Sequence, residues 1–331
     1  MLYSSGVAMR RREFIKIIAG STLVWPVDAQ AQEPGRVYRL AIVTTAGRDE
    51  PTSLAFLDEL RAQGFVEGKN LEFVSDGFRF DNEQAAAVVP AIIKAAPDAI
   101  VSAGDFITQK IKEATKSIPV VAMTEDMVAG GFAASLAKPG GNITGISLMS
   151  PDLDGKRQDI LIEAVPGAHR IAVLADSNVA TLEHLRALEA SARSHGKELL
   201  VVRAANAKEL LPAMDDASAQ GAGALNVLSS AMLTYNRRGI IERAAGLRLP
   251  AIYQWPETAD EGGLLGYGPS IIEVFRQRAR MVARVLRGAK PADVPIEQPT
   301  TFKLSINLKT ATTMSHTIPT GLLLRADKLI E

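Results

Sequence analysis

Polar side chains and one tryptophan follow the apolar runs that indicate buried strands, at the positions where α/β sheets bind ligands. The candidate ligand-binding residues are Thr45, Ser102, Gly104, Asp105, Thr124, Asp126, Asp176, Asn178, Ser229, Trp255 and Tyr267. Backbone N–H groups at the helix starts that follow these strands can hold a carboxylate or another anion. A tryptophan supplies a flat apolar wall for part of a ligand. The pattern predicts a small-molecule cleft with polar ends and an aromatic side.

Each of these residues also has a purely structural interpretation. Ser, Thr, Asp and Asn before a helix are favoured N-caps in any α/β protein, and capping is the better explanation for one residue taken alone. For the whole set, contributed by two halves of the chain, a cleft is the better explanation. Trp255 can equally be a core residue, although Gln254 and Pro256-Glu257 beside it favour a rim. Tyr267-Gly268-Pro269 lies at a predicted crossing between the halves and is a hinge, a ligand contact or both.

No pattern of residues points to catalysis, to a metal or to a cofactor. The four histidines, at positions 169, 184, 195 and 316, lack the i, i+4 spacing of a helical zinc pair. P-loop and GxSxG motifs are absent, and Gly221-Ala-Gly223 precedes a strand, the wrong order for a dinucleotide fingerprint. The chain has no cysteine, which excludes thiolate ligands, thiol nucleophiles and disulfides. We therefore expect a binding protein and not an enzyme.

The composition narrows the class of partner. The 331 residues are 47% hydrophobic and 22% charged, as in ordinary globular proteins, and their number allows two domains. Thirty-seven basic residues balance thirty-seven acidic ones, so the chain lacks the electrostatic footprint of a protein that binds nucleic acid or an anionic membrane. Aromatic residues make up 5%, too few for a broad surface that stacks single strands. The expected partner is a small molecule.

The first 31 residues have the order of an export signal. Arg10-Arg11-Arg12 is positive, residues 15–25 are mostly apolar but too few to span a bilayer, and Ala29-Gln30-Ala31 is an A-x-A cleavage site. Arg11 to Lys16 resembles the twin-arginine motif, although general secretory export stays open. No later segment has 18 consecutive apolar residues. We expect cleavage after Ala31 and a mature protein in the periplasm, outside the membrane and monomeric.

The chain after residue 31 contains two copies of one arrangement of predicted strands and helices. Arg39-Leu-Ala-Ile-Val43 returns as Arg170-Ile-Ala-Val-Leu174, and Ile118-Pro-Val-Val121 returns as Leu249-Pro-Ala-Ile252, both at an offset of 131. In both copies short apolar runs alternate with amphipathic stretches, which predicts parallel sheets covered on both faces. We therefore expect an α/β fold of two doubly wound, Rossmann-like lobes.

The expected elements follow from these runs. The first copy has strands near 38–43, 71–74, 99–102, 119–123 and 143–147 and helices near 51–63, 82–95, 106–115 and 129–137. The second has strands near 171–175, 198–203, 224–228 and 250–254 and helices near 153–165, 181–195, 206–219 and 235–245. The last part adds a strand at 264–267, a helix at 271–286 and an alternating, edge-like strand at 302–306.

Five stretches together carry a family resemblance: GFVEGKN at 64–70, SLAKPGGNITGIS at 135–147, GGLLGYGP at 262–269, RGAKPAD at 287–293 and FKLSINLKT at 302–310. Over about residues 37–331 the chain resembles the ABC transporter substrate-binding proteins of the type I periplasmic binding protein fold. Within that family it is similar to the branch related to tryptophan and other aromatic amino acid binders. The resemblance implies two lobes joined by a multi-strand hinge, a small molecule enclosed between them, and delivery to an inner-membrane ABC permease.

The resemblance also implies lobe boundaries. It places residues 37–149 and about 264–290 in the N-terminal lobe. Residues 150–263 and about 295–331 form the C-terminal lobe.

One position departs from the family's pattern. Similar proteins have a small or hydroxyl residue where this chain has Asp105. An acidic side chain there competes with an anion for the helix-start N–H groups and can instead face an amine, and Glu125 and Asp126 add to this. The ligand implied is a small organic solute, an amino acid or an aromatic compound, with its orientation open.

Two other functions remain open from the residues alone. An exported α/β enzyme is compatible with the fold, but the lack of a nucleophile–base or metal pattern counts against it. A ligand-binding input module for a membrane sensor would use the same two-lobed clamp. A DNA-binding regulator is disfavoured, because an export signal occupies the place of a DNA-binding head.

Overall fold

A parallel five-stranded sheet with the order β2-β1-β3-β4-β5 forms the centre of the first lobe in the described part of the chain. The computed structural model describes residues 35–74, 77–78, 80 and 82–331. The strands are β1 (Tyr38–Val43), β2 (Leu71–Phe73), β3 (Ala99–Ala103), β4 (Val120–Thr124) and β5 (Ile143–Ser147). All residues of β3, β4 and β5 are buried, as expected for parallel strands with helices on both faces.

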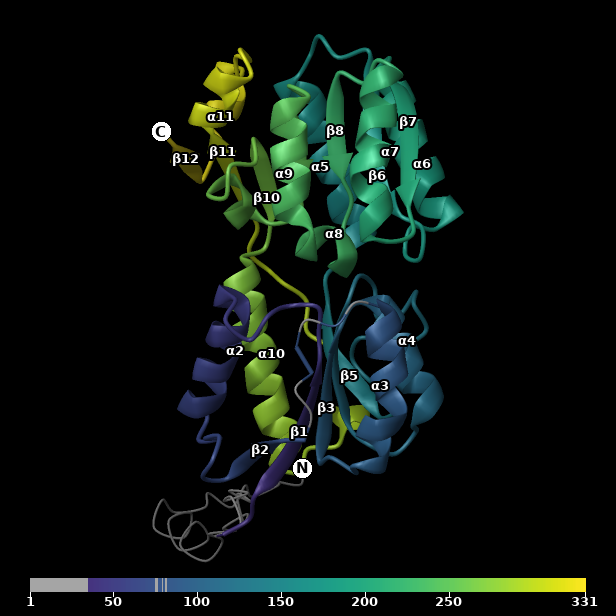
Figure 1. Ribbon diagram of the computed structural model, residues 1–331, viewed down its shortest axis with the longest axis vertical. Helices are drawn as coiled ribbons and strands as arrows, with labels where there is room; N and C mark the ends of the chain where they lie inside the picture. Colours follow the sequence, from purple (N-terminus) through teal and green to yellow (C-terminus); the bar gives the residue numbers. More distant parts are fainter. Residues whose placement is uncertain (1–34, 75–76, 79, 81) are drawn as a thin grey trace, which may run out of the picture. The chain divides into compact units, whose positions relative to one another are not determined.

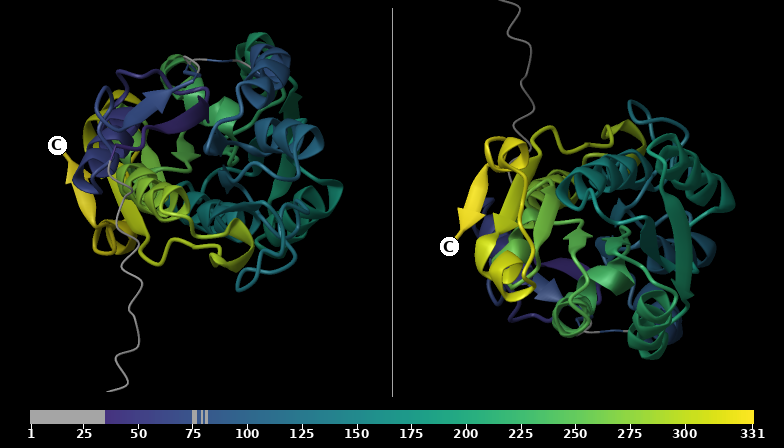
Figure 2. Two further views of the ribbon diagram at one scale, coloured as in Figure 1. Left: turned by 90° about the horizontal axis from the view of Figure 1, so that it is seen from below. Right: turned by 90° about the horizontal axis from the view of Figure 1, so that it is seen from above.

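The second lobe has, within residues 82–331, a seven-stranded sheet with the order β12-β11-β10-β9-β8-β6-β7. Its strands are β6 (Arg170–Asp176), β7 (Glu198–Ala204), β8 (Ala224–Val227), β9 (Ala251–Tyr253), β10 (Leu265–Gly268), β11 (Lys303–Asn307) and β12 (Lys328–Ile330). Neighbouring strands are parallel except β10 and β11, which are antiparallel. Figure 2 shows β11 and β12, in yellow, at one side of this lobe.

Helices cover both faces of the first sheet (Figure 1). On one face α2 (Pro51–Ala62) and α10 (Ile271–Leu286) lie side by side, and on the other lie α3 (Asn82–Lys94) and α4 (Asp105–Ala114). Pro51 opens α2, where its fixed φ suits the first helical position and its missing N–H costs nothing. The apolar side of α10 packs with α2 and the sheet in one buried cluster.

The second sheet is covered in the same way. Leucine and alanine side chains of α6 (Leu182–Ser194), α7 (Ala207–Ala219) and α9 (Arg237–Gly246) form one buried cluster with its strands. The opposite face packs against α5 (Ser150–Ala164), α11 (Leu308–Thr313) and α12 (Thr320–Leu323). The short elements are α8 (Ala231–Tyr235), η1 (Pro256–Ala259) and η2 (Pro291–Asp293). The expectation of an α/β fold with two parallel-sheet lobes is confirmed.

The chain passes between the lobes after β5, after β10 and after Glu297. At the second passage Glu257 of the second lobe holds the start of α10, because its Oε1 accepts hydrogen bonds from the Ser270 hydroxyl at 2.6 Å and the Ile271 N–H at 3.1 Å. Polar contacts therefore join the lobes beside the peptide chain itself.

Two lobe boundaries differ from the expectation. The strand expected at 264–267 in the N-terminal lobe is β10, which belongs to the second sheet because it pairs with β9 and β11. The boundary near 264 is therefore wrong, and the chain crosses after Gly268. The last crossing was expected near 295, but Ile296 still packs in the first lobe and Glu297 bridges Ile146 of β5.

One expected helix is wrong, and one expected strand is confirmed but does not lie at the edge of its sheet. Residues 129–137 form turns, not a helix, because the Asp126 carboxylate accepts the next free N–H groups and Gly131 adopts a φ of +69°. The segment expected at 302–306 is β11, and it is not an edge strand because β12 pairs along its outer side. Its polar residues alternate with apolar ones, but Ser305 and Asn307 are buried and Lys303 alone is exposed among the residues of this strand.

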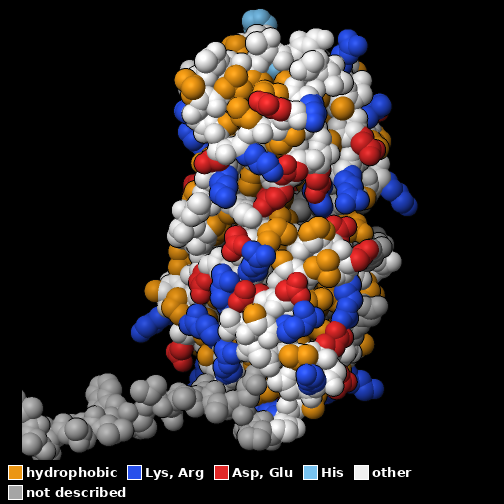
Figure 3. Space-filling view, turned by 90° about the vertical axis from the view of Figure 1, so that its left-hand side faces the viewer, with side chains coloured by type: hydrophobic (Ala, Val, Ile, Leu, Met, Phe, Trp, Pro, Cys, Tyr) orange, Lys and Arg blue, Asp and Glu red, His pale blue; other side chains and the backbone are white. Residues whose placement is uncertain are grey.

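The predicted export signal, with its twin-arginine motif and cleavage after Ala31, lies outside the described residues. Among the described residues no helix is long and apolar enough to cross a bilayer. On the face shown in Figure 3, basic and acidic side chains are interspersed, without a large area of one sign.

Candidate ligand-binding cleft

The carboxyl ends of strands from both sheets border a cavity of about 610 Å³ between the lobes. This volume includes space that is open to solvent. The apolar residues of the lining include Ala103, Met123, Leu148, Trp255, Ile271 and Phe275. Its uncharged polar lining includes Thr44, Thr45, Thr52, Ser230, Thr234 and Gln254, and its charged lining residues are Glu50, Glu125 and Arg237. The cavity therefore combines an aromatic side with a few convergent polar groups.

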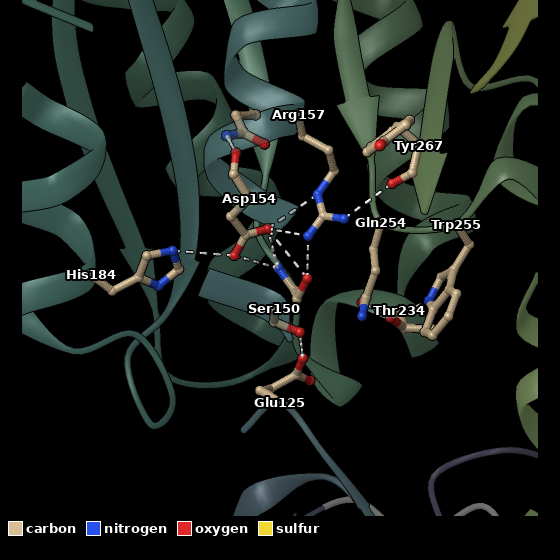
Figure 4. Close-up of polar contacts among 11 residues, drawn as sticks. Glu125, Ser150, Asp154, Arg157, His184, Thr234, Gln254, Trp255 and Tyr267 are labelled. Atoms are coloured by element: carbon tan, nitrogen blue, oxygen red, sulfur yellow. Dashed lines mark hydrogen bonds and ion pairs between the residues drawn. The ribbon is translucent and has the colours of Figure 1, made fainter. Parts of the chain in front are cut away.

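Trp255 forms the aromatic wall contributed by the second lobe. It directly follows β9, is 3% exposed, and belongs to the same buried cluster as Phe275 of α10. Its ring N–H donates to the Thr234 hydroxyl at 3.0 Å, and that hydroxyl donates to Gln254 Oε1 at 3.2 Å (Figure 4). These bonds fix the orientation of the indole ring. Trp255 is thus a core residue and a cleft wall at once.

Gly104 of the first lobe lies close to Ala231 of the second lobe at the cavity. It joins β3 to α4 with a φ of +89°, a conformation that favours glycine. A Cβ atom at this position would lie 2.8 Å from the Cβ of Ala231 in the second lobe. A residue without a side chain is therefore required here for the lobes to meet.

Glu125 is the buried carboxyl group of the cavity. It follows β4, is 7% exposed, and accepts a hydrogen bond from the Ser150 hydroxyl at the start of α5 (Figure 4). Burial and, next, the neighbouring Asp105 carboxylate raise the pKa of Glu125 to about 8. At neutral pH this group is mostly protonated, and a cation placed beside it would favour its ionised form.

Asp105, which contacts the backbone of Glu125, interacts with two further carboxyl groups. Burial raises the pKa of Asp105 to about 6. The hydrogen bond from the Glu125 N–H to Asp105 Oδ1, at 2.9 Å, lowers this pKa, whereas charge repulsion by Asp126 and Asp176 raises it. Burial also raises the pKa of Asp176 of the second lobe. This side of the cleft is therefore acidic, with carboxyl groups from both lobes.

A buried ion-pair network lies beside the cleft in the second lobe (Figure 4). Arg157 and Asp154 pair one turn apart on α5, and both are almost completely buried. Arg157 also donates to the Ser229 hydroxyl at 2.6 Å and to the Tyr267 carbonyl oxygen at 3.0 Å. His184 Nε2 lies 3.4 Å from Asp154 Oδ2. The network joins α5, the end of β8 and β10 next to a lobe crossing, and it braces the hinge instead of lining the cavity.

Arg237 connects the two lobes at the mouth of the cavity. Its Nε and Nη2 donate to both carboxylate oxygens of Glu261 at 2.7 and 2.9 Å. Its Nη2 also lies 3.7 Å from Glu50 Oε2 at the start of α2 in the first lobe. One arginine is therefore shared by two carboxylates from different lobes.

Of the residues predicted from the sequence, Thr45, Gly104 and Trp255 line the cavity. The others lie outside its lining. Ser102 and Thr124 are completely buried, and the Ser102 hydroxyl is 2.9 Å from that of Thr108.

The remaining predicted residues have structural partners. Ser229 and the Tyr267 carbonyl belong to the Arg157 network, and the Tyr267 ring stacks on Phe302. Asp105 accepts a backbone N–H, and Asp126 caps the turn that follows β4. Exposed Asn178 donates to Asp176 and to a loop carbonyl. The capping interpretation therefore accounts for Asp126 and for the Asp176–Asn178 pair.

Sequence reasoning missed the lining residues that come from helices. Glu50 precedes Pro51 as the N-cap of α2, and Ile271 and Phe275 lie in the first turns of α10. Arg237 begins α9, after the short helix α8. A search at the ends of predicted strands cannot find these positions. The one signal in the sequence was Glu50-Pro51, because a proline after an acidic residue is typical of a helix start. Within the described residues, no group of three or more His, Cys, Asp or Glu side chains is arranged to hold a metal ion.

Two α/β lobes joined by crossing segments, with a cavity between them, are the architecture of the periplasmic binding proteins. Residues 39–330 match the family described as ABC transporter substrate binding protein, and the chain belongs to this family. The resemblance inferred from the sequence is thereby confirmed. Because the family is one of binding proteins, the expectation of a binder and not an enzyme also holds.

Known proteins are similar to this chain in sequence or in fold, at low sequence identity. A tyrosine-binding protein of Clostridioides difficile is 23% identical over 247 residues, which cover 73% of this chain and 70% of that protein. A conserved domain protein of Vibrio cholerae superposes with a TM-score of 0.80 at 24% identity, covering 89% of this chain and all of that one. A Streptococcus pneumonia protein solved with L-Trp gives 0.78 at 21% identity with the same coverage.

Proposed function

We propose that this chain is the periplasmic receptor of an ABC-type importer and captures a small organic solute, an amino acid or an aromatic compound, in its interlobe cleft. The observation that carries the proposal is the cavity lined from both lobes, with Trp255 on one side and Glu125 on another. Residues 1–31 act as a twin-arginine export signal, and the mature monomer presents its ligand to an inner-membrane permease.

Hinge closure provides the mechanism. Contacts from both lobes to one ligand exist only when the lobes are together, so the ligand shifts the balance from open to closed forms. Moving that balance from 1:99 to 99:1 needs about 5.5 kcal/mol of differential binding. A few hydrogen bonds and an enclosed aromatic contact supply energies of this order.

The experiment is a ligand screen that uses Trp255 as the reporter. The chain has two tryptophans, and Trp25 lies in the proposed export signal, so the mature protein of residues 32–331 carries Trp255 as its one tryptophan. Aromatic, branched and acidic amino acids, aromatic acids, amines and sugars are titrated, with thermal unfolding as a second readout. A ligand at a hundred times its dissociation constant adds about 2.7 kcal/mol of stability, a shift on the order of 5–10 °C.

Substitution of Trp255 gives the matched control. Trp255→Ala is expected to weaken ligand binding at least about tenfold, whereas Trp255→Phe keeps a ring and much of the affinity. Both are compared by thermal shift, since both lose the fluorophore. Unchanged affinity in the alanine variant removes Trp255 from the site. Chemical turnover of the bound solute would contradict a receptor function.

A further inference from the structure

The helix starts around the cavity, which are the natural sites for a ligand carboxylate, already face carboxyl groups of this chain. Asp105 is the first residue of α4, and its carboxyl group accepts the N–H of Glu125. Ser150 at the start of α5 donates to Glu125, and Glu50 is the N-cap of α2. A ligand carboxylate at these places would lie next to another carboxyl group, and it would further disfavour the ionised forms of Glu125 and Asp105, whereas a cation would favour them.

The two arginines near the cleft do not offer a free guanidinium group to the cavity. Among the described residues that line the cavity, Arg237 is the one cation, and Glu261 takes two of its N–H groups while Glu50 lies within 3.7 Å. Arg278 donates to the Ser102 carbonyl at 3.3 Å, and its Nε has no hydrogen-bond partner among the described residues. It is 2% exposed and lies outside the lining, over the Phe275 ring at 4.4 Å. Arg237 is therefore already paired, and Arg278 does not reach the cavity.

We propose, building on the receptor function above, that the cleft takes an arylalkylamine: an organic cation with an aromatic body and without a carboxylate. The aromatic body would lie along Trp255 and Phe275, which line the cavity from the two lobes. The ammonium group would face Glu125, the buried acid of the lining. The acidic groups from both lobes attract a cation and repel an anion.

Glu125 can respond to such a ligand. The polar and charged groups around it are the Ser150 hydroxyl, Asp105 and, through α5, Asp154 with Arg157. With a pKa of about 8 the free carboxyl group is mostly protonated at pH 7. An ammonium ion beside it stabilises the carboxylate, so binding releases a proton from Glu125 to solvent. An uncharged ligand of the same shape would release none.

The test compares ligand pairs that differ by one carboxylate. Tryptamine with L-tryptophan, and tyramine with L-tyrosine, are titrated into the full chain by calorimetry in two buffers of different ionisation enthalpy. We expect each amine to bind about tenfold or more tightly than its amino acid, with net proton release at pH 7. Tighter binding of the amino acids, or binding of neither amine, overturns the inference.

Variants of two neighbouring acids separate a specific contact from general charge. Glu125→Gln should lower tryptamine affinity at least about tenfold and abolish proton release, whereas Asp126→Asn, outside the lining, should change affinity by less than about threefold. Equal effects of the two substitutions refute the placement of the ammonium group.

The ligand panel separates this inference from the receptor function. If amino acids bind and amines do not, the receptor function stands and this inference fails. If the whole panel of solutes fails to bind, the receptor function fails as well.

Discussion

Glu125→Gln is expected to make the protein more stable at neutral pH, because burial holds this carboxyl group in its protonated form. The unfolded chain loses the proton near pH 4.5 and the folded chain near pH 8. Between these values the folded state binds more protons than the unfolded state, so stability falls as the pH rises through this window and levels off above it. Below pH 4.5 both states are protonated and the contribution vanishes.

The size of this destabilisation follows from the two pKa values. At about 1.4 kcal/mol per pH unit, the buried carboxyl group lowers the free energy of unfolding by on the order of 3 kcal/mol at pH 7 and 5 kcal/mol above pH 8. Glutamine is neutral throughout and keeps an oxygen that can accept from the Ser150 hydroxyl. The variant should therefore gain on the order of 5–10 °C in unfolding midpoint over the wild type between pH 4.5 and 7.

The assay is thermal unfolding of both proteins, without ligand, from pH 4 to pH 8.5. The pKa of Asp105 is also raised, to about 6, so the stability of the variant should still fall with pH between about pH 4 and 6, but less steeply than that of the wild type. Glu189→Gln, an exposed acid paired with Arg193, is the control and should follow the wild type. Parallel curves for the wild type and Glu125→Gln would refute the reasoning.

Three further substitutions test the cleft and the hinge. Gly104→Ala places a Cβ 2.8 Å from that of Ala231 and should weaken ligand affinity about tenfold in calorimetry while the far-ultraviolet spectrum stays unchanged. Arg157→Met leaves Asp154 buried without its partner and should cost about 3–5 kcal/mol in urea unfolding; a loss under about 1 kcal/mol would contradict the network. Gly145→Ala sets a Cβ 1.8 Å from the Ala122 carbonyl oxygen, so recovery of folded protein would contradict the close approach of β4 and β5.

The lobes could be predicted because parallel strands leave a strong trace in sequence. Runs such as residues 99–103 and 120–124 are apolar except for Ser102 and Thr124 and are buried throughout, since helices cover both faces of the sheet. The helix at 271–286 was found from its amphipathic period, and the structure gives the same bounds. Which sheet β10 joins was not predictable, because a four-residue apolar run pairs equally well with either.

The cleft was predictable only in outline. Trp255 and Gly104 lie at strand ends, where the general rule looks, but Glu50 and Arg237 meet from helix starts almost 190 residues apart. The pair of Asp154 and Arg157 resembles an ordinary i, i+3 surface pair in the sequence. Its burial follows from the packing of α5 under β10, which single-sequence periodicity does not contain.

The position of α10 affects how the protein must be made. This helix completes the first lobe against α2, yet more than 200 residues of chain separate the two helices. A ribosome therefore finishes the whole β6–β10 region before the first sheet can receive its cover on that face. Contacts between residues so distant in sequence slow folding, and they leave the apolar surface that α10 later covers exposed to solvent until that helix is made. Part of the apolar face of the first lobe therefore stays uncovered until residue 286 has been synthesised and released.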